Sequence, residues 1–165
     1  MKSANLLICE LGGQVNSNPE ILISYPQTDL LKQQSKDLLE RCLPVGAKVG
    51  EFILNRYEKN KILSYVFKIG KEEERDDLLS ISIAFDKKVN EKIYKSILKE
   101  IIKQLDKNKL LTAEVLIKYQ ETIYNGLKNE EDIKIDVLEI QISDMFKENR
   151  EKFNQSKPKL KGSFF

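Results

Sequence analysis

Three apolar-rich segments follow one another in the middle of the chain: GEFILNRY at residues 50–57, KILSYVFKI at 61–69 and DLLSISIAF at 77–85. Alternating apolar and polar residues in such segments are typical of strands in an antiparallel sheet. Residues 87–105 then place apolar side chains three or four positions apart, which is the pattern of an amphipathic helix. This order predicts a three-stranded meander that leads directly into a helix.

Two of these strands also indicate which face meets which neighbour. The 61–69 strand has a more apolar face, predicted to point into the core, that carries Leu63, Tyr65, Phe67 and Ile69. The 77–85 strand has one face of small residues, which are Ser80, Ser82 and Ala84. Because these side chains are short, a helix can approach the sheet closely on that face.

The segments before the meander predict a hairpin and one helix. Residues 4–11 are almost continuously apolar, as in a central strand that is buried on both faces. Residues 21–25 form a second strand, which Pro26 stops. Helical spacing follows over residues 30–42 and ends at Pro44. The first two strands are therefore predicted to pair in an antiparallel manner before the chain turns into a helix.

Polar residues mark the ends of the later helices. Asp86 is predicted to cap the 87–105 helix and Thr112 the helix that follows, because their side-chain oxygens can accept backbone N–H bonds. Asn125 and Gly126 form a natural stop for this last helix.

Two periodicities overlap in the segment that follows residue 129. A period of two, typical of a strand, is set by Ile133, Ile135 and Val137. A helical period is set by Leu138, Ile142, Met145 and Phe146. The content of Glu, Lys and Gln favours a helix from about residue 131 to 154, although a strand within 131–142 stays open as an alternative.

Composition excludes several kinds of chemistry. The chain has 165 residues, with 28 Lys and Arg against 26 Asp and Glu, and it contains no His. Without His, the chain cannot build a Ser-His or Cys-His nucleophilic pair and lacks the commonest metal ligand. A GxxxxGK[ST] phosphate loop is absent from the sequence. We therefore expect a noncatalytic protein with no catalytic residue, no cofactor and no metal site.

Composition also bears on location and on nonprotein partners. No apolar run approaches the ~20 residues of a membrane span, so a soluble, cytoplasmic protein is expected. The small net charge predicts no strong binding to nucleic acid. The basic residues of the 156–165 tail, followed by two Phe, are compatible with a peripheral membrane contact. Cys9 and Cys42 are expected to be two buried or half-buried thiols in a reducing compartment.

The whole pattern predicts an α+β fold with one five-stranded antiparallel sheet. Its order of strand, strand, helix, three strands, helix, helix resembles a longin domain over about residues 6–127. The likeness is carried by the hairpin of 6–11 with 21–26, the meander of 52–85 and the helical stripe of 93–105. The segment SISIAFD at 80–86, which runs straight into a helix, is the most similar local piece.

The longin resemblance implies a profilin-like shape, with one helix on one face of the sheet and two on the other. The added C-terminal helix lies outside this pattern. We accordingly divide the chain into a longin-like domain at 1–128, a helical extension at 129–155 and a flexible tail at 156–165. The roadblock family is the nearest competitor, but its domains usually begin with a helix, and only three residues precede Ala4 here.

The resemblance further implies a protein–protein interaction module. Longin-like domains regulate small GTPases or serve as scaffolds in membrane-trafficking and signalling complexes, often as homo- or heterodimers. In the longin order, the 50–57 strand lies at a sheet edge, where unpaired backbone groups can bind a partner. The candidate contacts are Phe52, Leu54, Tyr57 and, on the first helix, Gln34. A small-molecule-sensing or enzymatic domain on the same scaffold is the alternative.

Overall fold

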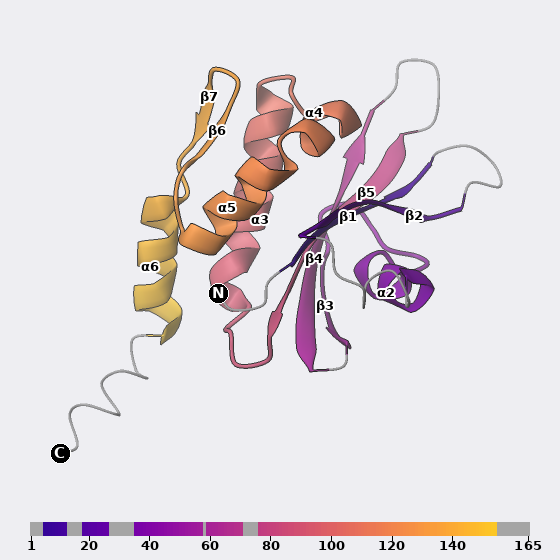
Figure 1. Cartoon of the computed structure of the whole chain (residues 1–165), viewed down its shortest axis with the longest axis horizontal. Helices are drawn as coiled ribbons and strands as arrows, with labels where there is room; N and C mark the ends of the chain where they lie inside the picture. The colour runs from indigo at the N-terminus through magenta and orange to yellow at the C-terminus, as the bar shows by residue number, and fades with distance from the viewer. Residues whose placement is uncertain (1–4, 13–17, 27–34, 58, 71–75, 155–165) are drawn as a thin grey trace.

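Five antiparallel strands form the central sheet, in the order β2-β1-β5-β4-β3 (Figure 1). The computed structural model describes residues 5–12, 18–26, 35–57, 59–70 and 76–154. The strands are Asn5–Leu11 (β1), Glu20–Tyr25 (β2), Phe52–Tyr57 (β3), Asn60–Ile69 (β4) and Asp77–Asp86 (β5). The predicted hairpin and meander are confirmed. The hairpin and the meander form one sheet because β1 pairs with β5 along its whole length.

The short helix α2 (Ser35–Cys42) covers one face of the sheet. Leu38 and Cys42 of this helix are fully buried in a core that includes Leu7 of β1 and Val66 of β4. On β5 the same face carries the small side chains that were predicted to admit a helix, and Ala84 belongs to this core. Beneath α2, the Ser64 and Ser82 hydroxyls are hydrogen-bonded to each other at 2.6 Å.

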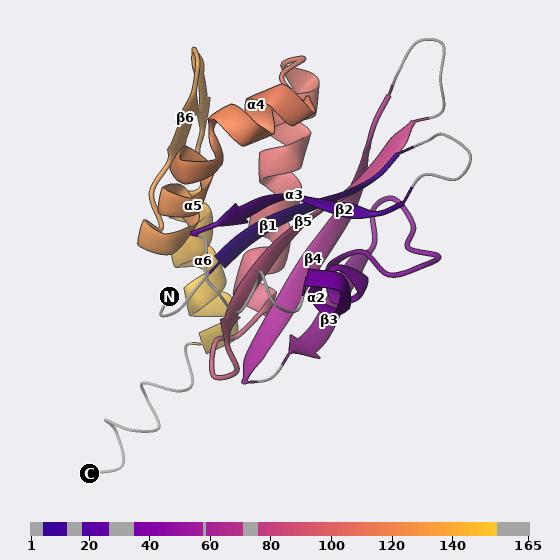
Figure 2. The same cartoon turned by 45° about the vertical axis from the view of Figure 1, so that its right-hand side comes forward.

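Three helices cover the opposite face: α3 (Lys92–Lys107), α4 (Ala113–Lys118) and α5 (Gln120–Asn129) (Figure 2). This face holds the larger core, and the apolar face predicted for β4 points into it. The helical stripe of α3 is buried there, through Ile93, Tyr94, Ile97, Leu98, Ile101, Ile102 and Leu105. The sheet is therefore sandwiched between unequal helical layers, as the sequence predicts.

The C-terminal segment forms a further layer on the outer side of α3 and α5. It consists of the hairpin β6 (Ile133–Ile135) and β7 (Leu138–Ile140), followed by α6 (Ser143–Asn154) (Figure 1). The preference for a helix from about residue 131 was therefore wrong for the hairpin, and it is confirmed only from Ser143 onward. Ile133 and Ile135 are fully buried against the main core, whereas Val137 at the turn is 90% exposed. Burial of alternate residues decided between the two overlapping periodicities.

Two predicted helix ends differ from the structure, and a third helix is interrupted although Thr112 caps it as predicted. Asp86 is the last residue of β5 and accepts the Lys88 backbone N–H in a turn, at 2.9 Å, so α3 begins only at Lys92. The helix that Thr112 caps is interrupted at Tyr119, where α4 gives way to α5. Gly126 does not end α5, which continues to Asn129 and stops at Glu130 in the left-handed conformation.

Glu130 is held in this conformation by α6. Arg150 donates two hydrogen bonds to the Glu130 carboxylate, at 2.6 and 2.9 Å. Asn149 donates to the backbone carbonyl of Ile93 on α3, at 2.8 Å. These bonds fix α6 against both neighbouring helices, and they join a buried contact between Phe146 and Tyr94, whose ring centroids lie 5.4 Å apart.

Asp132 caps the start of α6 from the opposite end of the hairpin. Its Oδ1 accepts the backbone N–H groups of Ser143 and Ile142, both at 2.9 Å. The hydrogen bond from Ser143 is the main reason that the pKa of Asp132 lies below its ordinary value of 3.8. A depressed pKa in the folded state means that the ionised carboxylate stabilises the fold.

We expect Asp132→Ala to lower the free energy of unfolding by ~1 kcal/mol at neutral pH, as loss of a helix cap usually does. The contribution is fully present above the unfolded pKa and declines as pH falls through the lower folded pKa. Urea unfolding of the wild type and of Asp132→Ala should show that the difference between their free energies of unfolding is smaller near pH 3 than at pH 7. The exposed Glu148→Ala on α6 is the control, and a pH-independent gap for Asp132→Ala would contradict the assignment.

Candidate functional site

Strand β3 lies at an edge of the sheet, as the sequence predicts. It begins after a bulge in which Gly50 and Glu51 both face Val66: Gly50 donates to the Val66 carbonyl at 2.8 Å, and Val66 donates to the Glu51 carbonyl at 3.0 Å. Gly50 has a φ of +87°, the left-handed conformation that this type of bulge requires at its first position. The bulge fixes the register of β3 on β4.

This register determines which backbone groups of β3 face outward. Antiparallel residue pairs alternate between exchanging two hydrogen bonds and exchanging none. Counting from the bulge, Ile53, Asn55 and Tyr57 bond to β4, so the backbone groups of Phe52, Leu54 and Arg56 point away from the sheet. The outward carbonyl of Arg56 accepts a hydrogen bond from the Arg41 guanidinium of α2. The outward backbone groups of Phe52 and Leu54 form a short run to which an added strand can bind.

The four predicted contact residues do not share one environment. Leu54 is 44% exposed, and Phe52 is half-buried with its ring centroid 4.9 Å from that of Tyr65. These two side chains lie on the α3 face of the edge. Tyr57 is only 4% exposed and belongs to the core under α2, so its side chain does not reach the surface. Gln34 lies outside the described residues.

The end of α2 and the edge strand form one connected surface. Asn55 of β3 donates to the Arg41 backbone carbonyl at 2.9 Å, which satisfies a carbonyl in the last turn of the helix. Arg41 lies 3.6 Å from the Asp37 carboxylate and 5.9 Å from the centroid of the Tyr57 ring. Any partner that adds to β3 would therefore also meet the exposed side of α2.

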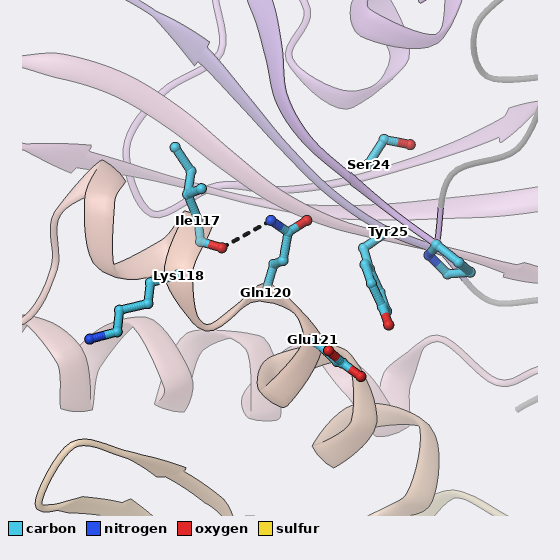
Figure 3. Close-up of a pocket in the computed structure, with 7 residues that line it drawn as sticks. Ser24, Tyr25, Ile117, Lys118, Gln120 and Glu121 are labelled. Carbon is cyan, nitrogen blue, oxygen red and sulfur yellow. Dashed lines mark hydrogen bonds between the residues drawn. The ribbon is translucent and has the colours of Figure 1, made fainter.

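A cleft of about 460 Å³ lies at the opposite edge of the sheet, between the end of β2 and the junction of α4 and α5 (Figure 3). Partial burial and, after it, the nearby Glu121 carboxylate raise the pKa of Tyr25. Figure 3 shows the Lys118 ammonium pointing away from both groups, and Gln120 donates to the Ile117 carbonyl at 2.9 Å. The Lys118 and Gln120 side chains therefore do not converge with Tyr25 and Glu121 on one point.

A second hollow, of about 630 Å³, lies between the beginning of β2 and α2. Its lining is mainly apolar, with Ile21 on the strand side and Leu39 and Leu43 on the helix side. Lys36 and Glu40 provide charges at its rim. Sequence periodicity gave no sign of either hollow, because each one is formed by segments that are separated in the chain.

The two cysteines, which the sequence predicts to be buried or half-buried, lie in the same core. Both are fully buried, Cys9 on the α2 face of β1 and Cys42 at the end of α2. The pKa of Cys9 is raised well above its ordinary value, first by its hydrogen bond with the Cys42 thiol and then by burial. Contact between them could not be read from the sequence, because nothing in the pattern fixes which face of α2 lies over which residue of β1.

In the part of the chain that the structure describes, no three His, Cys, Asp or Glu side chains are grouped so as to hold a metal ion. Among the same residues, no helix has both the length and the apolar character needed to cross a membrane.

Comparison with models of known protein families finds no match to this chain. A search of curated proteins finds no significant match either.

Proposed function

We propose that this chain is a noncatalytic protein–protein interaction domain of the longin type, which acts as a small-GTPase regulator or as a scaffold in a trafficking or signalling complex. The observation that supports the proposal best is the open edge of β3. There, backbone groups point outward beside the exposed Leu54 and the half-exposed Phe52. An edge of this kind can extend its sheet into a partner or into a second copy of the chain.

The proposed domain recognises its partner by surface complementarity. Any effect on nucleotide exchange would come from a higher affinity for one conformation of the GTPase. Such a partner class places the chain in the cytoplasm, at a membrane surface when the GTPase is membrane-bound. Purified small GTPases, each prepared nucleotide-free, with GDP and with a GTP analogue, would be passed over the immobilised chain. Retention of a GTPase that depends on its nucleotide supports the proposal. If no GTPase is retained in any nucleotide form, the result argues against it.

We expect Leu54→Glu to weaken partner binding at least tenfold, because a carboxylate would have to be desolvated inside the interface. Phe52→Glu should act in the same direction. Ile117→Glu is the matched control, because Ile117 is also 44% exposed but lies beside the cleft, away from β3. Titration calorimetry against the retained GTPase measures the change, and circular dichroism checks the fold. Equal affinities for all three variants would exclude the β3 edge.

A small-molecule-sensing domain is the second candidate function. The two hollows of about 460 and 630 Å³ favour it, since they fall in the ordinary size range of ligand sites. A metabolite library screened by thermal denaturation separates the two functions. A ligand that raises the melting temperature without any protein partner supports sensing, and Ile117→Glu should then reduce that effect while Leu54→Glu leaves it unchanged.

A further inference from the structure

Cys9 and Cys42 form a thiol pair between the sheet and the helix that covers it. Cys9 lies in β1, which is hydrogen-bonded on both sides, to β2 and to β5. Cys42 is the last residue of α2. Both side chains are fully buried in the same core beneath α2, and the Cys42 thiol contributes to the raised pKa of Cys9. The pair therefore joins two segments that are far apart in sequence and meet only in the folded protein.

The surrounding packing keeps the two thiols opposite each other. Ser80 on β5 lies directly across from Cys9, and its small side chain leaves room for α2 above the strand. Leu38, one turn before Cys42, is buried in the same core and sets the rotation of the helix. The chain after Cys42 bends at Gly46, which has a φ of +85°. Leu43, directly after Cys42, is still buried in this core, so the turn lies beyond it.

We propose that Cys9 and Cys42 are a redox modification site, at which an intramolecular disulfide ties α2 to β1. Closing the bond requires the two sulfur atoms to approach to about 2.05 Å, with a dihedral angle near 90°. The proposal concerns the fold itself and is independent of the partner proposed above.

The reaction uses a small-molecule disulfide of the glutathione type as its oxidant. The Cys42 thiolate attacks one sulfur of the oxidant, which gives a mixed disulfide on Cys42 and releases one glutathione thiolate. The Cys9 thiolate then attacks the Cys42 sulfur, which forms the internal bond and releases the second glutathione thiolate. Two protein thiols are oxidised, one glutathione disulfide is reduced to two glutathione thiols, and the two protons of the protein thiols end on these two glutathione thiols.

Burial determines the order and the speed of these steps. A buried thiol is a poor nucleophile because the thiolate is the attacking form. Cys42 lies in the last turn of an eight-residue helix, whereas Cys9 lies in a strand paired on both sides. Local opening exposes helix ends far more often than central strands. Cys42 is therefore the first residue to react, and the internal bond closes when α2 returns to the sheet.

The test is to equilibrate the full chain in buffers of increasing ratio of oxidised to reduced glutathione. We expect a monomer that has lost two hydrogens in mass, and in its tryptic digest a cross-link between the peptides that contain Cys9 and Cys42. Closing a loop of this length should raise the melting temperature by about 5–15 °C, and reduction should reverse the rise.

Cys9→Ser and Cys42→Ser are the matched variants, because each removes one sulfur and keeps a small side chain. Both should lack the cross-link and the rise in melting temperature, and Cys9→Ser should instead accumulate the mixed disulfide on Cys42. If a serine variant fails to fold, the wild-type cross-link and its melting temperature still decide the question. Persistence of both free thiols, glutathione on both cysteines, only intermolecular disulfides, or a cross-link without stabilisation would each overturn the proposal.

Discussion

Replacing Phe146 by alanine should lower the free energy of unfolding by about 3–5 kcal/mol, the usual cost of emptying a buried aromatic site. Phe146 of α6 is almost fully buried, and its ring lies 5.4 Å from that of Tyr94 on α3. The Tyr94 ring in turn lies 5.3 Å from Phe85 of β5. The three rings connect the C-terminal helix through α3 to the sheet, so the cavity would form in the main core.

Urea unfolding monitored by circular dichroism measures this change, and Lys147→Ala at the next, exposed position is the control. The control should change the free energy of unfolding by less than about 0.5 kcal/mol. A single transition for both variants would show that α6 unfolds together with the sheet. A loss below 1 kcal/mol for Phe146→Ala, or a separate early transition, would mean that α6 is only loosely attached.

Gly126→Ala should destabilise the protein by about 2–3 kcal/mol, although alanine is the better helix former. A Cβ atom at this position would lie 2.3 Å from Cγ1 of Ile133 and 3.1 Å from the Glu131 backbone oxygen. Alanine normally gains ~1 kcal/mol over glycine inside a helix. The steric cost outweighs that gain because Ile133 is fully buried and the Glu131 carbonyl belongs to the backbone.

Asn125→Ala is the neighbouring control, since Asn125 is exposed on the same helix. It should leave the free energy of unfolding unchanged or slightly higher. The double variant Gly126→Ala with Ile133→Ala removes the clashing side chain, so its loss should be smaller than the sum of the two single losses. Equal or increased stability of Gly126→Ala would show that the hairpin can move away from α5 at little cost.

Elements with a single clear periodicity could be predicted closely. The strands β4 and β5 alternate over ten residues each, and α3 has an uninterrupted apolar stripe, so their faces and neighbours followed from the pattern. Their exact ends were less certain. The sequence predicts Asp86 as a helix cap, but its carboxylate instead accepts a backbone N–H in the turn after β5. Both arrangements satisfy a backbone N–H, so the sequence pattern does not distinguish them.

The position of the candidate site could be predicted from the sequence, but which residues belong to it could not. The longin resemblance implied that β3 lies at the sheet edge, and the strand order confirms this position. Alternation puts Phe52 and Leu54 together on one face. It does not indicate that Tyr57, on the other face, is covered by α2 and Arg41, because the cover comes from a separate segment.

Local residue patterns were thus sufficient for the α+β class, for the antiparallel sheet and for the helical layers on its two faces. Contacts between distant segments settled the rest: the β6–β7 hairpin, the burial of Tyr57, the two hollows and the pairing of Cys9 with Cys42. The physical reason is that periodicity reflects the backbone of one segment, whereas burial and proximity depend on which other segments pack against it.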